Sequence, residues 1–155
     1  MCIRDRNWTS QQYNATAFGE NTASDSVGYA FRAYWLPEES GSFVPEISIG
    51  YDIKDFEDGS TGDASEADSY MLGLTWKDMI QPDDKIGFAI TQPLKVTEVV
   101  GGGDFSEVDP ILWELYHSFK PNDSISITPA IFGGTDVWQE GDDLFGAVVT
   151  SAFKF

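Results

Sequence analysis

Period-two alternation runs through most of the chain from about residue 25 onward. Apolar or aromatic side chains occupy every second position, and small or polar side chains occupy the positions between them. This is the pattern of β-strands that have one apolar and one polar face. The pattern predicts an all-β protein without helices, whose seven strands lie in segments 27–35, 46–53, 70–77, 86–92, 111–119, 124–131 and 145–155.

The connections between these strands alternate in length, which predicts an antiparallel up-and-down meander. Segments 37–42, 81–84 and 121–123 are short, whereas the acidic segments 57–67 and 99–108 are longer and 136–141 is intermediate. Tight turns at one end and longer loops at the other are typical of outer-membrane β-barrels. We therefore expect residues 25–155 to form barrel strands, with the short turns in the periplasm.

Aromatic residues gather at the two ends of the predicted strands. Amphipathic rings settle at the headgroup level of a bilayer, while aliphatic residues fill the band between them. The predicted aromatic belts comprise Tyr29, Trp35, Tyr51, Tyr70, Trp76, Phe119, Phe145, Phe153 and Phe155.

Charged residues within the strands fall on the polar phase. A lipid-facing Lys or Arg costs about 2–4 kcal/mol near the middle of a bilayer, so the polar phase should face a water-filled lumen. The predicted pore-lining residues are Arg32, Tyr34, Glu46, Asp52, Lys77, Gln92, Glu114 and Lys154.

The amino-acid composition excludes several classes of partner and chemistry. The 155 residues include nine Lys and Arg against 26 Asp and Glu, a formal net charge of −17, which disfavours nucleic acid as a partner. The single cysteine, Cys2, and the single histidine, His117, leave little for metal or general-base chemistry. We expect no catalytic residue, no cofactor and no metal site, and we expect His117 to lie near the inner lipid boundary.

The acidic segment 55–68 allows two interpretations. Its carboxylates are hard oxygen ligands of the kind that calcium takes, although their spacing does not match an EF-hand loop. A solvated loop, bridged by divalent cations to lipopolysaccharide phosphates, is the favoured interpretation. On charge alone, acidic loops and a mixed polar phase predict a mild preference for cations or neutral solutes over anions.

The hexapeptide MCIRDR at 1–6 resembles a translated sequencing adapter, so we interpret it as non-native, with a real N-terminus as the alternative. Apolar and polar residues alternate poorly over 11–21, and segment 7–24 is expected to form an external loop. A weak eighth strand at 13–18, which would complete a small barrel, remains an alternative.

Two stretches carry a family resemblance. PNDSISITPAIFGGT at 121–135, followed by an acidic loop and a last strand ending in Phe155, resembles the C-terminal end of cyanobacterial outer-membrane porins of the OprB-like carbohydrate-selective family. MLGLTWKDM at 71–79 with GFAITQPLKVTE at 87–98 resembles the preceding hairpin. The similarity runs with gaps from about residue 25 to the end.

The resemblance implies a barrel of roughly sixteen strands in the bacterial outer membrane that passes carbohydrates and ions and is sometimes linked to iron uptake. It also implies a terminal phenylalanine that engages the barrel-assembly machinery, and a monomer or homotrimer. His117 departs from the family pattern, and the upstream strands and anchoring domain are missing.

Seven spans cannot close a bacterial single-chain barrel, which takes an even number of strands. Open edges in lipid would also leave backbone groups without hydrogen bonds. We therefore expect an open fragment of a larger porin. The alternative from another class is a secreted all-β module that binds carbohydrate or calcium. Such a module would fold in buffer around its apolar faces.

Overall fold

The computed structural model describes residues 25–38, 43–57, 59–102, 109–137 and 141–154. These residues form seven strands and no helix, and hence no apolar helix of membrane-spanning length. The strands are β1 (Asp25–Trp35), β2 (Glu46–Glu57), β3 (Ala64–Lys77), β4 (Lys85–Val99), β5 (Ile111–Asn122), β6 (Ile125–Thr135) and β7 (Leu144–Phe153). The expectations for segments 1–6, 7–24 and 13–18, and for Phe155, lie outside the described residues.

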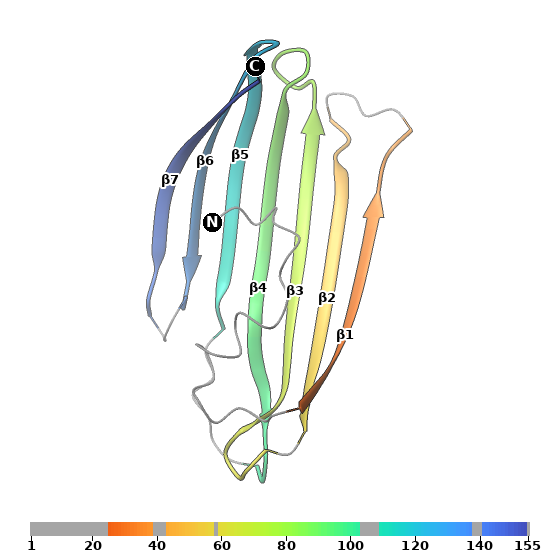
Figure 1. Cartoon of the computed structure of the whole chain (residues 1–155), viewed down its shortest axis with the longest axis vertical. Coiled ribbons are helices and arrows are strands. Elements are labelled where there is room, and N and C mark those ends of the chain that lie inside the picture. Colours follow the sequence, from red (N-terminus) through yellow and green to blue (C-terminus); the bar gives the residue numbers. More distant parts are fainter. Residues whose placement is uncertain (1–24, 39–42, 58, 103–108, 138–140, 155) are drawn as a thin grey trace.

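The strands form one sheet in sequence order, and every neighbouring pair is antiparallel (Figure 1). β1 and β7 lie at the two margins, and the sheet is open between them. The predicted all-β meander of seven strands is therefore confirmed. Period-two alternation located the strands because each strand exposes two different faces.

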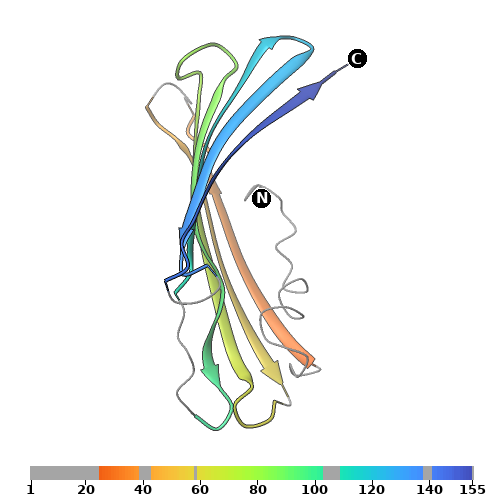
Figure 2. The same ribbon diagram turned by 90° about the vertical axis from the view of Figure 1, so that its left-hand side faces the viewer.

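The sheet is curved and single-layered over the described residues (Figure 2). Among their hydrophobic side chains only Phe56 and Ala67 are buried. A soluble domain of this size buries most of its apolar side chains in a second layer of structure. Within the described residues, no second layer covers the apolar face of this sheet.

The connections at the two ends of the sheet differ less in length than the sequence suggested. Segments 36–45, 78–84 and 123–124 connect strands at one end, called here the turn end. Segments 58–63, 100–110 and 136–143 connect them at the other, the loop end. The expected long connection at 57–67 is shorter than 36–45, because pairing of Asp55 with Glu66 carries the β2–β3 ladder into the acidic segment.

A bulge in β4 reverses the alternation near the loop end. Tyr70 pairs with Gln92 and Asp68 with Lys95, so Pro93 and Leu94 together oppose Ser69. Proline has no N–H to donate to a ladder, and a bulge is a place where a strand tolerates it. Lys95 and Val96 therefore show the opposite parity on each face, until a second register shift pairs Glu98 with Glu66.

A second proline interrupts the β5–β6 ladder. Tyr116 pairs with Ala130 and Phe119 with Ile127, whereas no pair is formed at the level of Pro129. The Thr128 hydroxyl donates to the Ser118 hydroxyl at 2.9 Å beside this gap. A side-chain hydrogen bond thus joins the two strands where the backbone cannot.

Glycines make room for large side chains on neighbouring strands. Gly87 pairs directly with Tyr116, and a Cβ on Gly87 would lie 2.5 Å from the tyrosine hydroxyl oxygen. Gly133 is similarly covered by Trp113, at 2.9 Å from its ring. Aromatic rings over glycine recover packing that a glycine strand lacks, and they pin the register.

We expect Gly134→Ala to lower the free energy of unfolding by about 1–3 kcal/mol, the usual cost of overpacking. Its Cβ would lie 2.7 Å from the Ile111 carbonyl oxygen, which belongs to the backbone and cannot rotate away. The measurement is urea unfolding followed by tryptophan fluorescence, in the medium in which the protein folds.

Gly28→Ala is the matched control. It also replaces a strand glycine, but the nearest atom, the Ile53 carbonyl oxygen, is 4.0 Å from the added Cβ. This variant should be as stable as the parent protein or slightly more stable. Equal losses in the two variants would show that strand glycine itself, rather than the close approach at Gly134, sets the cost.

Candidate functional site

The apolar face of the sheet is continuous from one margin to the other. Cross-strand pairing places apolar-phase residues side by side in rows that cross all seven strands. One complete row consists of Ala33, Ile49, Leu72, Ile90, Trp113, Gly133 and Phe145. The register therefore joins the apolar positions of separate strands into one surface.

This apolar face is exposed. Ile49 is 40% exposed and Val149 is 69% exposed, and Leu74 and Trp113 are half-buried. Exposed apolar patches far larger than those of ordinary soluble monomers mark surfaces that contact protein or membrane. The apolar side chains of this sheet therefore do not form a closed interior within the described structure.

Aromatic side chains at the turn end follow a regular stagger. Trp35 aligns through Ile47 with Leu74, and Trp76 lies two residues further along β3 (76 − 74 = 2). Trp76 aligns through Ile86 with His117, and Phe119 lies two residues further along β5 (119 − 117 = 2).

The same step brings the line of rings to β7. Phe119 aligns through Ile127 with Ser151, and Phe153 lies two residues further (153 − 151 = 2). The four rings thus lie on a straight line, which is oblique to the hydrogen-bonded rows. Each step along it covers two strands and two residues.

A second aromatic line runs toward the loop end at a constant distance. Tyr29 precedes Trp35 by six residues, as Tyr70 precedes Trp76 (35 − 29 = 76 − 70 = 6). Trp113, which the belt prediction omitted, precedes Phe119 by the same spacing (119 − 113 = 6) and lies beside Phe145, with 6.3 Å between ring centroids. The repeated spacing of six on alternate strands would have identified Trp113.

On the apolar face, polar side chains occupy the positions between the second aromatic line and the loop end. The Asp68 carboxylate accepts hydrogen bonds from the Tyr51 hydroxyl, at 3.2 Å, and from the Gln92 amide, at 3.3 Å. Asp68 pairs with Ile53 and Gln92 with Tyr70, so both lie on the phase of the apolar face. The prediction that Gln92 shares the polar face is therefore wrong, because it followed Thr91 rather than the alternation of β4.

The acidic segment 55–68 is mostly strand. Asp55 and Glu66 face each other across the β2–β3 ladder, and only 58–63 is a connection. Within the described residues, no group of His, Cys, Asp and Glu is arranged to hold a metal ion. Asp58 lies outside the description.

The polar face carries two ion-pair clusters. In the first, the Tyr34 hydroxyl donates to Glu46 at 2.5 Å, and the Lys77 ammonium forms an ion pair with the same carboxylate. Glu46 is only 7% exposed, so its negative charge is largely covered by these partners. Lys85 pairs directly with Lys77 across the β3–β4 ladder, which adds a second positive charge.

The second cluster lies further from the turn end. The Arg32 guanidinium contacts the Asp52 carboxylate at 2.7 Å, and the Ser69 hydroxyl donates to the same oxygen at 3.1 Å. Glu114 also lies on this face and is buried. Lys154 is exposed just after β7.

The polar face is the more enclosed side of the sheet. Glu46, Thr91 and Glu114 are buried on it, although it consists of the same single layer as the exposed apolar face. Side chains converge on the inside of a curved sheet and diverge on the outside, and from the burial on the central strands we infer that the polar face is the concave one. The structure thus combines an exposed apolar face with a polar face that is more enclosed over the central strands.

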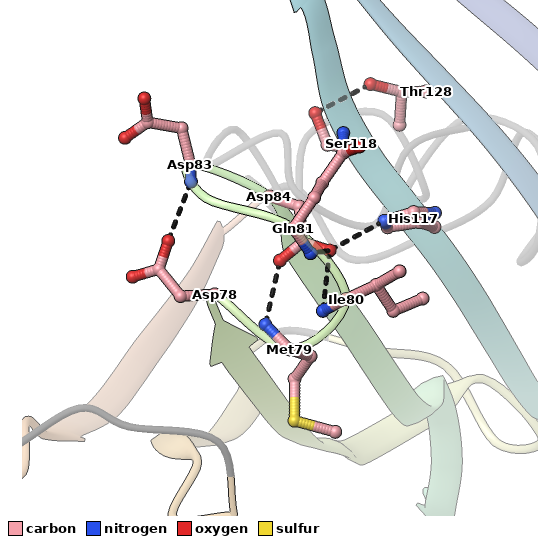
Figure 3. Close-up of polar contacts among 9 residues, drawn as sticks. All are labelled: Asp78, Met79, Ile80, Gln81, Asp83, Asp84, His117, Ser118 and Thr128. Carbon is pink, nitrogen blue, oxygen red and sulfur yellow. Dashed lines mark hydrogen bonds and ion pairs between the residues drawn. The ribbon is translucent and has the colours of Figure 1, made fainter.

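A buried carboxylate holds the β3–β4 turn against β5 (Figure 3). Asp84 is 1% exposed and accepts backbone N–H groups of Met79, at 2.9 Å, Ile80, at 3.1 Å, and Gln81, at 3.3 Å. His117 Nε2 lies 3.0 Å from Asp84 Oδ2. The histidine is on the apolar phase of β5, opposite Ile86, and its partner is this turn.

The hydrogen bonds overcome the cost of burying this charge. Burial alone would raise the pKa of the Asp84 carboxyl, but the bond to His117 and the three backbone N–H groups hold its pKa below the ordinary value. The ionised form is therefore the one that the folded turn favours. This cluster is structural, because its acceptor atoms are occupied by the protein itself.

Comparison with known proteins identifies no relative. No protein family, no curated protein and no solved structure matches the chain.

Asp84→Asn should destabilise the protein, because the amide offers one oxygen where the carboxylate offers two acceptors. We expect the acid limb of stability against pH to change with it. The pKa is lower in the folded protein than in the unfolded chain, so the stabilisation is complete above the unfolded value of about 3.9. It disappears as the pH falls through the folded value.

The measurement is urea unfolding at a series of pH values from neutral to acid. Asp83→Asn is the control, since Asp83 is an exposed residue of the same turn. Asp83→Asn should retain the acid limb, and Asp84→Asn should flatten it. Identical profiles for the two variants would show that Asp84 does not contribute to the pH dependence.

Proposed function

We propose that this chain forms part of the wall of an outer-membrane porin, through which small hydrophilic solutes such as carbohydrates and ions diffuse without a chemical step. The observation that carries the proposal is the pair of staggered aromatic lines on an exposed apolar face. The resemblance to OprB-like carbohydrate-selective porins supports it. The polar face would then line the water-filled lumen.

The stagger has the slope that tilted membrane strands require. Strands are about 4.8 Å apart and rise about 3.3 Å per residue. A step of two residues over two strands therefore corresponds to an angle of about 35°. Transmembrane strands are tilted by about 35–45°, so the aromatic lines would lie level with the membrane surface.

Strand length and chemistry agree with this orientation. The strands contain 10 to 15 residues, and a tilted strand needs about 9–11 to cross the hydrocarbon. Between the two aromatic lines the apolar face presents residues such as Leu72 and Ile90. The Asp68 cluster lies beyond the second line, where headgroups and water would solvate it.

The proposal also suggests partners. Lipid and lipopolysaccharide would cover the apolar face, and the barrel-assembly machinery would engage the C-terminal strand. A homotrimer would match the family that the sequence resembles, and a link to iron uptake would follow the same resemblance.

The alternative of a secreted carbohydrate- or calcium-binding module fits the geometry less well. Such a domain requires a second layer over its apolar face, and the described residues provide none. The two hypotheses also predict opposite solubility, because a soluble module folds in buffer whereas a porin wall requires detergent or lipid.

Planar-bilayer recording on the complete polypeptide, purified as its host makes it, tests the proposed function. We expect stepwise conductance increases as single pores insert. A protein that folds in buffer, remains outside vesicles and produces no conductance would contradict the proposal.

Two neighbouring residues of β4 provide a test of the faces. Phe88 lies on the apolar face midway between the two aromatic lines, and Ala89 lies on the polar face at almost the same depth. We expect Phe88→Arg to lower the free energy of unfolding in lipid vesicles by about 2–4 kcal/mol, because it places a charge in the middle of the hydrocarbon. Ala89→Arg should cost much less, since its charge would meet lumen water.

The measurement is equilibrium unfolding in vesicles, followed by tryptophan fluorescence. Both variants add the same charge to the same strand, so their difference isolates the face. A larger loss for Ala89→Arg would place lipid on the polar side and overturn the assignment.

A further inference from the structure

Positive charge is concentrated on the polar face, although the chain as a whole is strongly acidic. The sequence has nine Lys and Arg, of which Arg4 and Arg6 lie outside the described residues, so seven are described (9 − 2 = 7). Of these seven, Lys95 alone follows the apolar phase, because the bulge at Pro93 turns it outward. The others follow the polar phase: Arg32, Lys54, Lys77, Lys85, Lys120 and Lys154.

The acidic side chains of the sheet show the opposite distribution, with few on the polar face. Between the ends of the strands the polar face carries Glu46, Asp52 and Glu114. Asp55, Glu66 and other acids of the β2–β3 hairpin lie on the outward phase or in connections. The net charge of −17 therefore does not describe the surface that a solute in the lumen would meet.

Exposure increases this difference. Glu46 and Glu114 are 7% and 5% exposed, whereas the side chains of Arg32 and Lys77 are 46% and 33% exposed. Glu46 and Glu114 are recessed beneath neighbouring side chains and Arg32 and Lys77 reach toward solvent, whereas Asp52 is partly exposed and Lys54 is buried. Water and ions at this face therefore contact more positive than negative groups.

The side chains of Glu46, Lys77 and Lys85, called here the Glu46 cluster, have an excess of one positive charge. Lys77 and Lys85 are directly opposite each other, an arrangement that is unfavourable for like charges. Glu46 forms its ion pair with Lys77, and the three side chains together carry a net charge of +1 (2 − 1 = 1). The hydroxyl of Ser118, opposite Lys85 on β5, adds a neutral donor beside it.

We propose that this polar wall makes the pore favour small anions over cations, with Lys85 as a selectivity-determining residue. The inference rests on the proposed porin function. The proposed anion preference differs from the preference for cations or neutral solutes that is expected from charge alone. The sequence does not show which acidic side chains are buried, so that expectation counted all of them. Rings and rows of basic side chains are the usual basis of anion selectivity in pores.

The test is the reversal potential of the complete protein in planar bilayers under a KCl gradient at low ionic strength, where screening is weak. We expect Lys85→Gln to reduce the ratio of chloride to potassium permeability by about twofold. Lys95→Gln removes the same charge from the outward face and should leave the ratio unchanged. Lys85→Arg keeps the charge and should also leave it unchanged.

The outcomes separate the two proposals. If the channels conduct but Lys85→Gln leaves the ratio unchanged, or shifts it no more than Lys95→Gln does, the selectivity inference is overturned and the porin function stands. If the parent protein forms no channel, both proposals fail. Loss of the Lys85→Gln effect in 1 M salt, where the Debye length falls to about 3 Å, would support an electrostatic origin.

Discussion

The strict alternation of side chains across a single antiparallel sheet is the constraint on which every other feature depends. Between the two margins, backbone N–H and C=O groups are satisfied by neighbouring strands, so this part of the sheet needs no second layer to complete its hydrogen bonds. Each face can then meet a different environment. One face of this sheet is apolar and exposed, and the other is polar and enclosed. The register aligns each face over seven strands, which turns separate strand patterns into two surfaces with distinct chemistry.

Much of this architecture could be predicted from the sequence, because a period of two is a local signal that needs no knowledge of distant contacts. The strands, their order and most members of the two faces follow from it. Gln92 was misplaced because it was grouped with the polar Thr91, whereas its own parity places it with Ile90. Local composition outweighed alternation in that assignment.

Other features depend on contacts between distant residues, which the sequence does not display. Asp84 is one of several acids in its turn, and nothing nearby shows that it is the buried one. Asp84 is the buried acid of this turn because it contacts His117, which the β4–β5 ladder places beside it. The extent of the β2–β3 hairpin was hidden for a related reason. Acidic residues usually indicate loops, yet here cross-strand pairing continues through Asp55 and Glu66.

The oblique stagger of the aromatic rings also has a consequence for size. A strand tilted by about 35° occupies about 6 Å of circumference, so seven strands would contribute about 40 Å of perimeter. In a barrel of eight strands that arc would nearly complete the ring and bring β1 close to β7. The two strands instead lie at opposite margins of a gently curved sheet (Figure 1). In the proposed porin, a sheet whose margins lie this far apart would belong to a wide ring, and the bore of that ring would be too broad for side chains alone to fill.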